Sequence, residues 1–303
     1  MQFELTILGS NGAISAYNRH PSSQILNYNG NLFLIDCGEG TQFQMNKYGI
    51  KRGRLDNIFI SHLHGDHYFG LVGLLTTFNL NWREHPLHIY GPEGLEEIIN
   101  VHFKHSQTQL KFNIHFHVVT TVEQQLIYDD GVLTVETIIL KHRLPTTGFL
   151  FREKNNLRKI IPQKISEYSI PYEKIKSIKH GDDFTTSNGS VVANKELTEA
   201  PPRPRSYAYC SDTAYIESLK EQISGVDLLY HEATFMHEHA QRAEETMHST
   251  SKQAAAVAQK AKAGKLLVGH FSARYENLEI LLNESREIFP ETFLAEEGKV
   301  FSI

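Results

Sequence analysis

The chain has 303 residues, of which 40% are hydrophobic, which is enough for a substantial core in one large domain or two small ones. Its 30 Lys and Arg against 35 Asp and Glu give a formal net charge of −5. This balance argues against indiscriminate nucleic-acid binding by the whole surface.

Targeting signals and redox chemistry are also constrained. No apolar run approaches the ~18 residues of a membrane span, and no basic segment followed by an apolar run opens the sequence. We therefore expect neither a signal peptide nor contact with a membrane. The two cysteines, Cys37 and Cys210, lie in apolar strand-like contexts and are predicted to be buried free thiols. The composition predicts a cytoplasmic protein.

Strand and helix signals alternate along the chain. Strands are expected at 2–9, 25–36, 115–119 and 133–140, and helices at 41–47, 67–80, 94–103 and 251–263. The strands at 115–119 and 133–140 have only loop between them, which favours two mixed sheets covered by helices over a doubly wound sheet. Residues 161–192 break this rhythm, and we interpret the region as an insertion or protruding arm.

The segment from Phe59 to His67 carries three imidazoles and one carboxylate within six residues, directly after an apolar strand. Imidazole nitrogen and carboxylate oxygen suit zinc, with manganese or iron as weaker options. A turn after the strand, with Gly65 supplying backbone freedom, can direct His62 and His64 to one side and Asp66 and His67 to the other. One tetrahedral zinc does not need so many adjacent ligands, so the spacing predicts two metals.

Three later strands end in ligand-type residues in the same way. His142, Asp212 and His270 each follow an apolar run, as expected where strands deliver side chains to a common sheet edge. Together with the first segment they make five His and two Asp, the set that two zinc ions with a bridging carboxylate require.

These ligands resemble those of the metallo-β-lactamase superfamily, whose motif alone also fits hydrolases of thioesters, lactams, lactones and sulfate esters. Three further stretches resemble the ribonuclease Z family: Asp36–Gln42, His231–Thr234 and His248–Thr250. The resemblance spans residues 5 to 303. It implies a zinc endoribonuclease that hydrolyses a phosphodiester bond to remove the 3′ trailer from precursor tRNA, leaving a 3′-hydroxyl on the tRNA.

The resemblance also implies roles for individual residues. His62, His64 and His142 would hold one zinc, Asp66, His67 and His270 the second, and Asp212 would bridge them. Asp66 would accept a proton from the attacking water. His248 would assist the leaving group and be oriented by Glu232. A His with a pKa of roughly 6.5 suits that task, although His248 could also be a plain helix-flanking residue and Glu232 a plain sheet-edge carboxylate.

At the level of architecture, the resemblance implies a four-layer αβ/βα sandwich as one domain over residues 1–303, and a homodimer. Residues 151–192 would form an inserted arm that binds the tRNA body, since eight Lys or Arg oppose three Glu between Arg152 and Lys179. The RNA contacts expected are Lys174, Lys176 and Lys179 in the arm, and Arg19, which is all that remains here of a family loop that binds the tRNA end.

Two other functions stay open on the sequence. One is a small-molecule metallohydrolase of the same fold, similar to an esterase or arylsulfatase, against which His248 and the basic arm speak. The other is a catalytically silent RNA-binding protein, against which the complete ligand set speaks.

Overall fold

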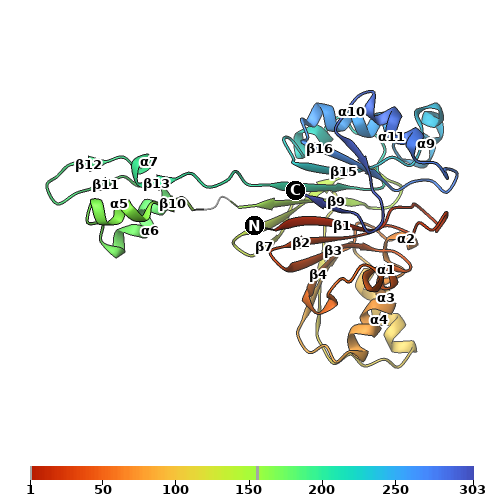
Figure 1. Cartoon of the computed structure of the whole chain (residues 1–303). Coiled ribbons are helices and arrows are strands. Elements are labelled where there is room, and N and C mark those ends of the chain that lie inside the picture. The colour runs from red at the N-terminus through yellow and green to blue at the C-terminus, as the bar shows by residue number, and fades with distance from the viewer. Residues whose placement is uncertain (1, 155–156) are drawn as a thin grey trace. The chain divides into compact units, whose positions relative to one another are not determined.

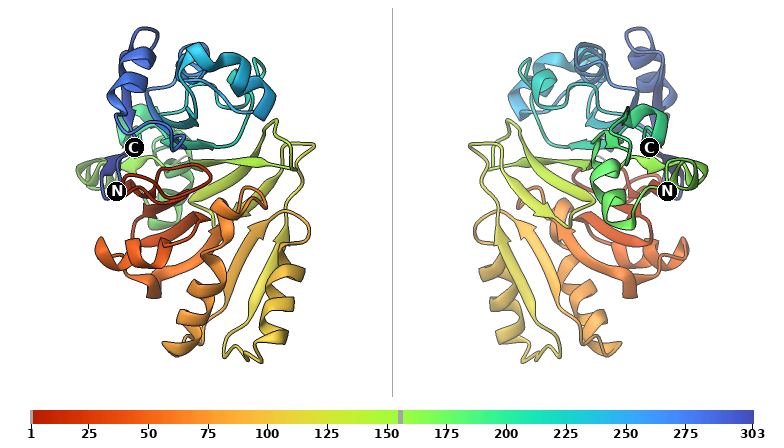
Figure 2. Two further views of the ribbon diagram at one scale, coloured as in Figure 1. Left: turned by 90° about the vertical axis from the view of Figure 1, so that its right-hand side faces the viewer. Right: turned by 90° about the vertical axis from the view of Figure 1, so that its left-hand side faces the viewer.

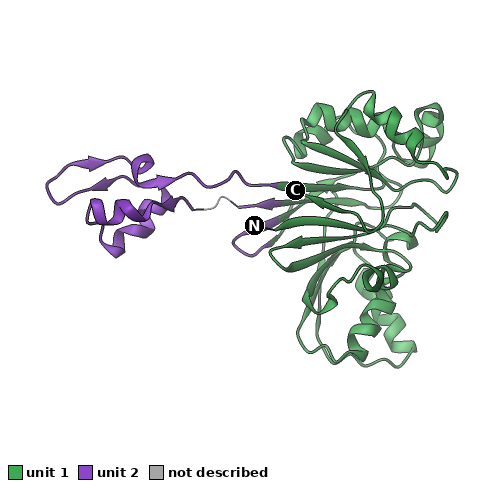
Figure 3. Ribbon diagram, in the orientation of Figure 1, with its two compact units in different colours: residues 1–128, 135–151, 206–303 green, residues 129–134, 152–205 purple. Residues whose placement is uncertain are grey.

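The computed structural model describes residues 2–154 and 157–303, which form two compact units. Unit 1 comprises residues 2–128, 135–151 and 206–303, and unit 2 comprises 129–134 and the described residues of 152–205 (Figure 3). The arm predicted over 151–192 includes residues 155 and 156, which lie outside the described part of the chain. No helix among the described residues is both long and apolar enough to span a bilayer.

The first sheet has seven strands and mixed direction. Their order is β18 (Val300–Ser302), β1 (Phe3–Gly9), β2 (Ser23–Tyr28), β3 (Asn31–Cys37), β4 (Leu55–Phe59), β5 (Leu87–Gly91) and β6 (Ile114–Val118). The pairs from β18 to β3 are antiparallel, and those from β3 to β6 are parallel. The single strand predicted over 25–36 is therefore wrong. It is a hairpin, because Asn29 and Gly30 adopt the positive φ values of a tight turn.

The second sheet also has seven strands. Their order is β17 (Thr292–Leu294), β16 (Lys265–Gly269), β15 (Leu228–Glu232), β14 (Ser206–Cys210), β9 (Thr147–Glu153), β8 (Leu133–Ile139) and β7 (Leu126–Asp129). The pairs β14–β15, β15–β16 and β16–β17 are parallel. The carboxyl ends of β14, β15 and β16 therefore lie along one edge of this sheet.

Helices cover the outer faces of both sheets (Figures 1 and 2). The helices on the side of the first sheet are α1 (Thr41–Lys47), α2 (Gly65–Tyr68), α3 (Leu71–Leu80) and α4 (Leu95–His105), with a 3₁₀ turn at Arg52–Arg54. Those on the side of the second sheet are α8 (Leu219–Gln222), α9 (Ala240–Thr246), α10 (Ser251–Ala261) and α11 (Glu279–Arg286), with a 3₁₀ turn at His237–His239. One apolar core packs the first helical layer against the first sheet, and a separate core packs the second helical layer against the second sheet.

Aromatic side chains fill the space between the sheets. Phe59 of the first sheet lies 5.3 Å from Phe149 and 5.4 Å from Phe151 of the second, measured between ring centroids. All three rings are fully buried, so the inner faces of the two sheets pack against each other. Unit 1 thus has helix, sheet, sheet and helix layers, and the predicted four-layer αβ/βα sandwich is confirmed.

Unit 2 has a small core of its own. Two short antiparallel strand pairs join β10 (Lys159–Ile160) to β13 (Thr198–Glu199) and β11 (Phe184–Thr185) to β12 (Val191–Val192), alongside helices α5 (Pro162–Glu167), α6 (Tyr172–His180) and α7 (Asn194–Leu197). Its apolar centre comprises Ile170, Ile178, Phe184, Val192 and Leu197. A region whose weak periodicity suggested an arm is therefore ordered around a few buried side chains.

Candidate metal centre

The candidate ligands come from the ends of strands in both sheets. His62 follows β4, His142 follows β8, Asp212 follows β14 and His270 follows β16. Asp212 and His270 adopt left-handed backbone conformations with φ of 55° and 56°, a minor region for non-glycine residues in which Asp and His are enriched. The backbone turns sharply at both residues as soon as the strand ends, and their side chains enter the same cluster.

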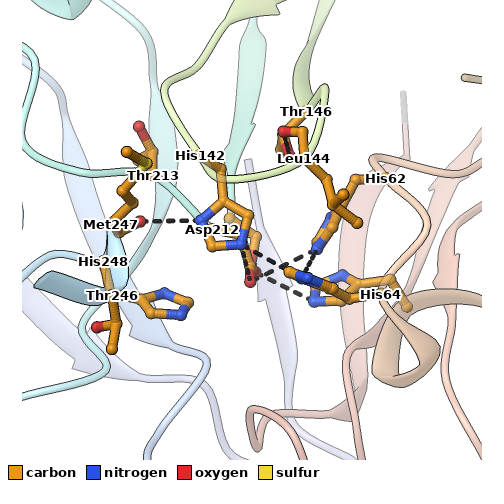
Figure 4. Close-up of polar contacts among 12 residues, drawn as sticks. His62, His64, His142, Leu144, Thr146, Asp212, Thr213, Thr246, Met247 and His248 are labelled. Atoms are coloured by element: carbon orange, nitrogen blue, oxygen red, sulfur yellow. Dashed lines mark hydrogen bonds and ion pairs between the residues drawn. The ribbon is translucent and has the colours of Figure 1, made fainter.

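One cluster contains His62, His64, His142 and Asp212, whose ligand atoms all lie within 4.8 Å of one another. Nδ1 of His64 lies 3.0 Å from Nε2 of His62 and 3.3 Å from Nε2 of His142. Oδ2 of Asp212 lies 3.6 Å from Nε2 of His62 and 3.7 Å from Nε2 of His142. Figure 4 shows His64, His142 and Asp212 converging on one point.

A second cluster contains Asp66, His67 and His270, again within 4.8 Å. Oδ2 of Asp66 lies 3.5 Å from Nε2 of both imidazoles. Oδ1 of Asp212 lies 3.1 Å from the same two nitrogens. Asp212 therefore presents one carboxylate oxygen to each cluster, which is the geometry of a bridging ligand.

These spacings fit metal coordination. With bonds of about 2.0–2.2 Å, the ligand atoms around a tetrahedral zinc lie about 3.3–3.6 Å apart. Nε2 of His67 and Nε2 of His270 are buried and have no hydrogen-bond partner among the described residues, and buried polar atoms are rarely left so in native proteins. A cation between these atoms would satisfy both, so the residues present fit the predicted metals.

The pKa values of the candidate ligands also support metal binding. Burial and the imidazole of His67 lower the pKa of His62, and burial also lowers the pKa values of His64 and His142, so these rings are neutral, as metal ligation requires. His67 differs, because the carboxylates of Asp212, Asp66 and Asp36 outweigh its burial and raise its pKa. The second cluster therefore favours added positive charge.

Asp36 supports His67 from behind, and the sequence analysis assigned it no role. Its Oδ2 lies 2.7 Å from Nδ1 of His67 and accepts a 2.6 Å hydrogen bond from the hydroxyl of Tyr209. Ser61 donates its backbone N–H and its hydroxyl to the same carboxylate. Asp36 is completely buried, and a carboxylate at the end of the apolar strand β3 was the signal that could have revealed it.

Other groups orient the remaining imidazoles. Nδ1 of His142 donates to the carbonyl oxygen of Met247 at 2.9 Å, drawn in Figure 4, and Nδ1 of His270 lies 3.0 Å from the hydroxyl of Thr234. Such partners fix the ring and its tautomer in metal sites. A backbone carbonyl has no sequence signature, so the contact with Met247 was not predictable.

His248 lies beside both clusters and carries a partner of its own. Its Nδ1 is 2.8 Å from Oε1 of Glu232, the last residue of β15. Glu232 also accepts hydrogen bonds from the backbone N–H groups of Thr213 and Ser249 and from the hydroxyl of Thr234. Burial opposes protonation of His248, but the charge of Glu232 and its hydrogen bond prevail and raise the pKa of His248 to about 9. The ordinary value expected from the sequence is therefore too low.

A cavity of about 490 Å³ opens over the centre. It is lined by ligands of both clusters and His248, and also by Ile14, Glu39, Phe69 and Arg143. Gly65 also lines the cavity, but the role of a glycine at this position differs from the predicted one. Its φ is not left-handed; instead, a Cβ atom there would clash with the ring of Phe69 where that ring now stands, so glycine permits the close approach of the ring.

The residues predicted to contact RNA lie in different surroundings. Lys174 and Lys176 are exposed on α6, and Lys179 is half-buried on the same helix. The guanidinium of Arg19 donates to Oδ1 of Asn11 and to the carbonyl oxygens of Tyr275 and Glu276. Arg19 therefore holds its loop in place, and an RNA contact by any of these four residues stays a prediction.

With paired His and Asp clusters at one edge of two helix-covered sheets, the chain falls in the class of metal-dependent hydrolases with the metallo-β-lactamase fold. The solved structure of the metallo-β-lactamase fold protein YhfI from Bacillus subtilis covers 100% of both chains at a TM-score of 0.69 and 20% identity, which supports the fold. The human tRNase Z short form covers 99% of both chains at a TM-score of 0.72 and 30% identity.

Sequence relatives narrow the class. Ribonuclease Z of Bacteroides thetaiotaomicron is 47% identical over 302 residues, covering 100% of this chain and 96% of the relative. Ribonuclease Z of Bacteroides fragilis is 46% identical over 302 residues, covering 100% and 99%. The chain therefore belongs to the ribonuclease Z family, and its prediction as a hydrolytic endoribonuclease is confirmed. Residues 3–206 also match, and so belong to, the family described as Anti-Pycsar protein Apyc1; that match ends before Asp212, Glu232, His248 and His270.

Proposed function

We propose that this chain is a two-zinc endoribonuclease that removes the 3′ trailer from precursor tRNA and leaves a 3′-hydroxyl on the tRNA. The observation that carries the proposal is the pair of partly buried His248 and fully buried Glu232, 2.8 Å apart, beside two clusters joined by Asp212. Hydrolysis of an unactivated phosphodiester needs both a water activated at neutral pH and a proton for the departing oxygen, and this arrangement offers a group for each.

In this proposal His62, His64 and His142 would hold one zinc, Asp66, His67 and His270 would hold the other, and Asp212 would serve both. Bound zinc supplies a water of lowered pKa and neutralises charge on the phosphoryl oxygens. The carboxylate of Asp66, which receives a 2.7 Å hydrogen bond from the backbone N–H of Ala13, is held in place to accept the proton of the attacking water.

His248 donates the proton that the departing ribose 3′-oxygen requires. The carboxylate of Glu232 accepts the hydrogen bond of Nδ1 and keeps the imidazole protonated through neutral pH. The proton available for donation is therefore the one on Nε2. Three hydrogen bonds hold the carboxylate of Glu232, which fixes the direction of the ring. General acid catalysis of this kind contributes typically 10²–10⁴-fold.

Unit 2, including the arm inserted at 151–192 in the domain over 1–303, is proposed to bind the body of the tRNA. Lys174 and Lys176 stand on the exposed side of α6, next to Tyr172, which is 84% exposed. A folded RNA presents phosphates and unpaired bases, which lysine and aromatic side chains bind. We further propose that the enzyme is a homodimer and acts in the cytoplasm, where precursor tRNA would be its substrate.

The test is cleavage of a 3′-extended tRNA by purified, zinc-loaded protein, with sequencing gels that locate the cut and enzymatic mapping of the new ends. A product with a 3′-hydroxyl at the end of the tRNA supports the proposal. Hydrolysis of generic esters by a protein that leaves the precursor tRNA uncut would reject the proposal in favour of a small-molecule hydrolase. Binding of the precursor without any hydrolysis would reject it in favour of a silent RNA-binding protein. Sedimentation of the same preparation measures the oligomeric state.

A further inference from the structure

An exposed aromatic ring stands at the mouth of the metal centre without a role in the chemistry above. Phe69 follows α2 directly, and its side chain is 65% exposed. It lines the same cavity as His64, Asp66 and His248, together with Ile14, which is 61% exposed. Two large apolar side chains left open to water beside a polar metal site form a surface suited to an apolar, planar group of the substrate.

The ring of Phe69 is held close to the ligand loop. Because Gly65 lacks a Cβ, the ring edge lies against the backbone of the loop that carries His64 and Asp66. Tyr68 packs edge-on against the ring, with centroids 5.1 Å apart and planes at 70°. The ring thus stands beside the ligand loop, while most of its surface stays accessible to a ligand.

We infer, resting on the proposed function, that Phe69 with Ile14 forms a stacking platform for the base of the first trailer nucleotide. Every nucleobase has a π-face, and stacking on an aromatic side chain contributes about 5- to 150-fold in affinity per base without sequence preference. A trailer has no fixed sequence, so a contact that tolerates any base suits it better than a set of hydrogen bonds.

The position of His248 indicates which side of the cut the platform serves. The departing 3′-oxygen belongs to the tRNA, and its proton donor His248 comes from the loop before α10, on the side of the second sheet. Phe69 comes from the other side of the sandwich, after β4 and α2 of the first sheet. With the tRNA end at His248, the strand that continues beyond the scissile phosphate reaches the wall that carries Phe69 and Ile14.

The experiment is a double-mutant cycle between protein and RNA. Wild-type enzyme and Phe69→Ala are compared on a 3′-extended tRNA that is intact or abasic at the first trailer nucleotide, with the phosphodiester chain unchanged. For the wild type we expect the abasic substitution to lower kcat/KM about tenfold. Phe69→Ala is expected to lose about tenfold on the intact RNA and to be indifferent to the missing base, while Phe69→Trp keeps wild-type behaviour.

Controls separate stacking from damage to the centre. Phe43→Ala removes a phenylalanine of similar exposure, 70%, that does not line the cavity, and should behave as the wild type on both RNAs. Metal content of Phe69→Ala should be unchanged, and Phe69→Leu provides a second variant that keeps apolar bulk without an aromatic face.

An abasic penalty of equal size in the wild type and in Phe69→Ala would overturn the inference, as would a wild type that tolerates the abasic trailer. Coupling seen only when the abasic nucleotide is the last one of the tRNA would overturn the assignment of the platform to the trailer. A wild type that does not cut the intact precursor rejects the proposed function itself, which distinguishes that failure from failure of the platform.

Discussion

Nδ1 of His248 lies 2.8 Å from Oε1 of Glu232, and the side chain of Glu232 is completely inaccessible to solvent. A buried carboxylate paired with a nearly buried imidazole makes the protonated form of the ring the stable one, which raises its pKa to about 9. The pair therefore supplies a proton donor at neutral pH that is separate from the seven proposed metal ligands.

Replacing His248 with Ala is expected to lower the rate of precursor cleavage by about 10²–10⁴-fold, because the ribose 3′-oxygen must then leave unprotonated. Turnover of bis-p-nitrophenyl phosphate, whose leaving group needs no proton, should largely survive, and both metals should remain. The measurement is kcat/KM on both substrates. His239→Ala, a neighbouring histidine outside the cavity, is the matched control, and equal losses on both substrates would contradict the role of His248.

The pH dependence of cleavage should change when Glu232 becomes Gln. A general acid must be protonated, so the rate falls as the pH rises through its pKa, which is about 9 for His248 beside Glu232. Without the charge of Glu232, the pKa falls toward or below its ordinary ~6.5 because burial is no longer opposed. The alkaline limb of kcat/KM should move to lower pH by about two units or more. An unmoved limb would show that another group controls it.

Asp212 is expected to govern both metal sites, since it presents Oδ1 to one cluster and Oδ2 to the other. The wild type should contain close to two zinc ions per chain, and Asp212→Ala should lower the occupancy of both sites. Elemental analysis after gel filtration measures this. A wild type with a single metal that survives the substitution would refute the shared-ligand arrangement.

Tyr209→Phe should weaken metal binding at the second cluster by about 10-fold or more, because its hydroxyl holds Asp36 against His67. Tyr207 provides a matched control on the same strand: it is equally buried, and its hydroxyl bonds Gln24 instead. Both variants lose one buried hydrogen bond, so their free energies of unfolding should fall similarly. Competition with a zinc chelator should separate them, and equal zinc affinities would remove Asp36 from the support of the site.

Charge on α6 is expected to set the salt dependence of tRNA binding. Each phosphate contact adds roughly 0.7–0.9 to the slope of log K against log salt, so replacing Lys174, Lys176 and Lys179 with Ala should flatten it by up to roughly 2–3. The KM for precursor tRNA should rise, while kcat on a small phosphodiester stays the same. Replacing Lys47, Lys51 and Lys104, three exposed lysines of unit 1, is the control. A wild-type slope in the α6 variant would mean that these lysines are only a solvated face.

The sequence by itself determined the class of fold and the chemistry of the site. Alternating strands and helices, with apolar runs that end in His or Asp, are local features that a single chain displays directly. His62, His142, Asp212 and His270 were recognisable because each follows an apolar strand-like run, and strands deliver the residues at their ends to the edge of a sheet. The same pattern, with the stretches around Glu232 and His248, was sufficient for the family.

Only the tertiary structure decided how these groups act on one another. Asp36 contacts His67, which is 31 positions away in the chain, and Tyr209, which is 173 positions away. Neither contact produces a periodic pattern in the sequence. The raised pKa of His248 arises from the charge of Glu232 and its hydrogen bond, and the close approach at Gly65 involves the ring of Phe69 and not a left-handed turn. Burial, distance and charge balance depend on packing across the whole sandwich, so they exist only once the chain is folded.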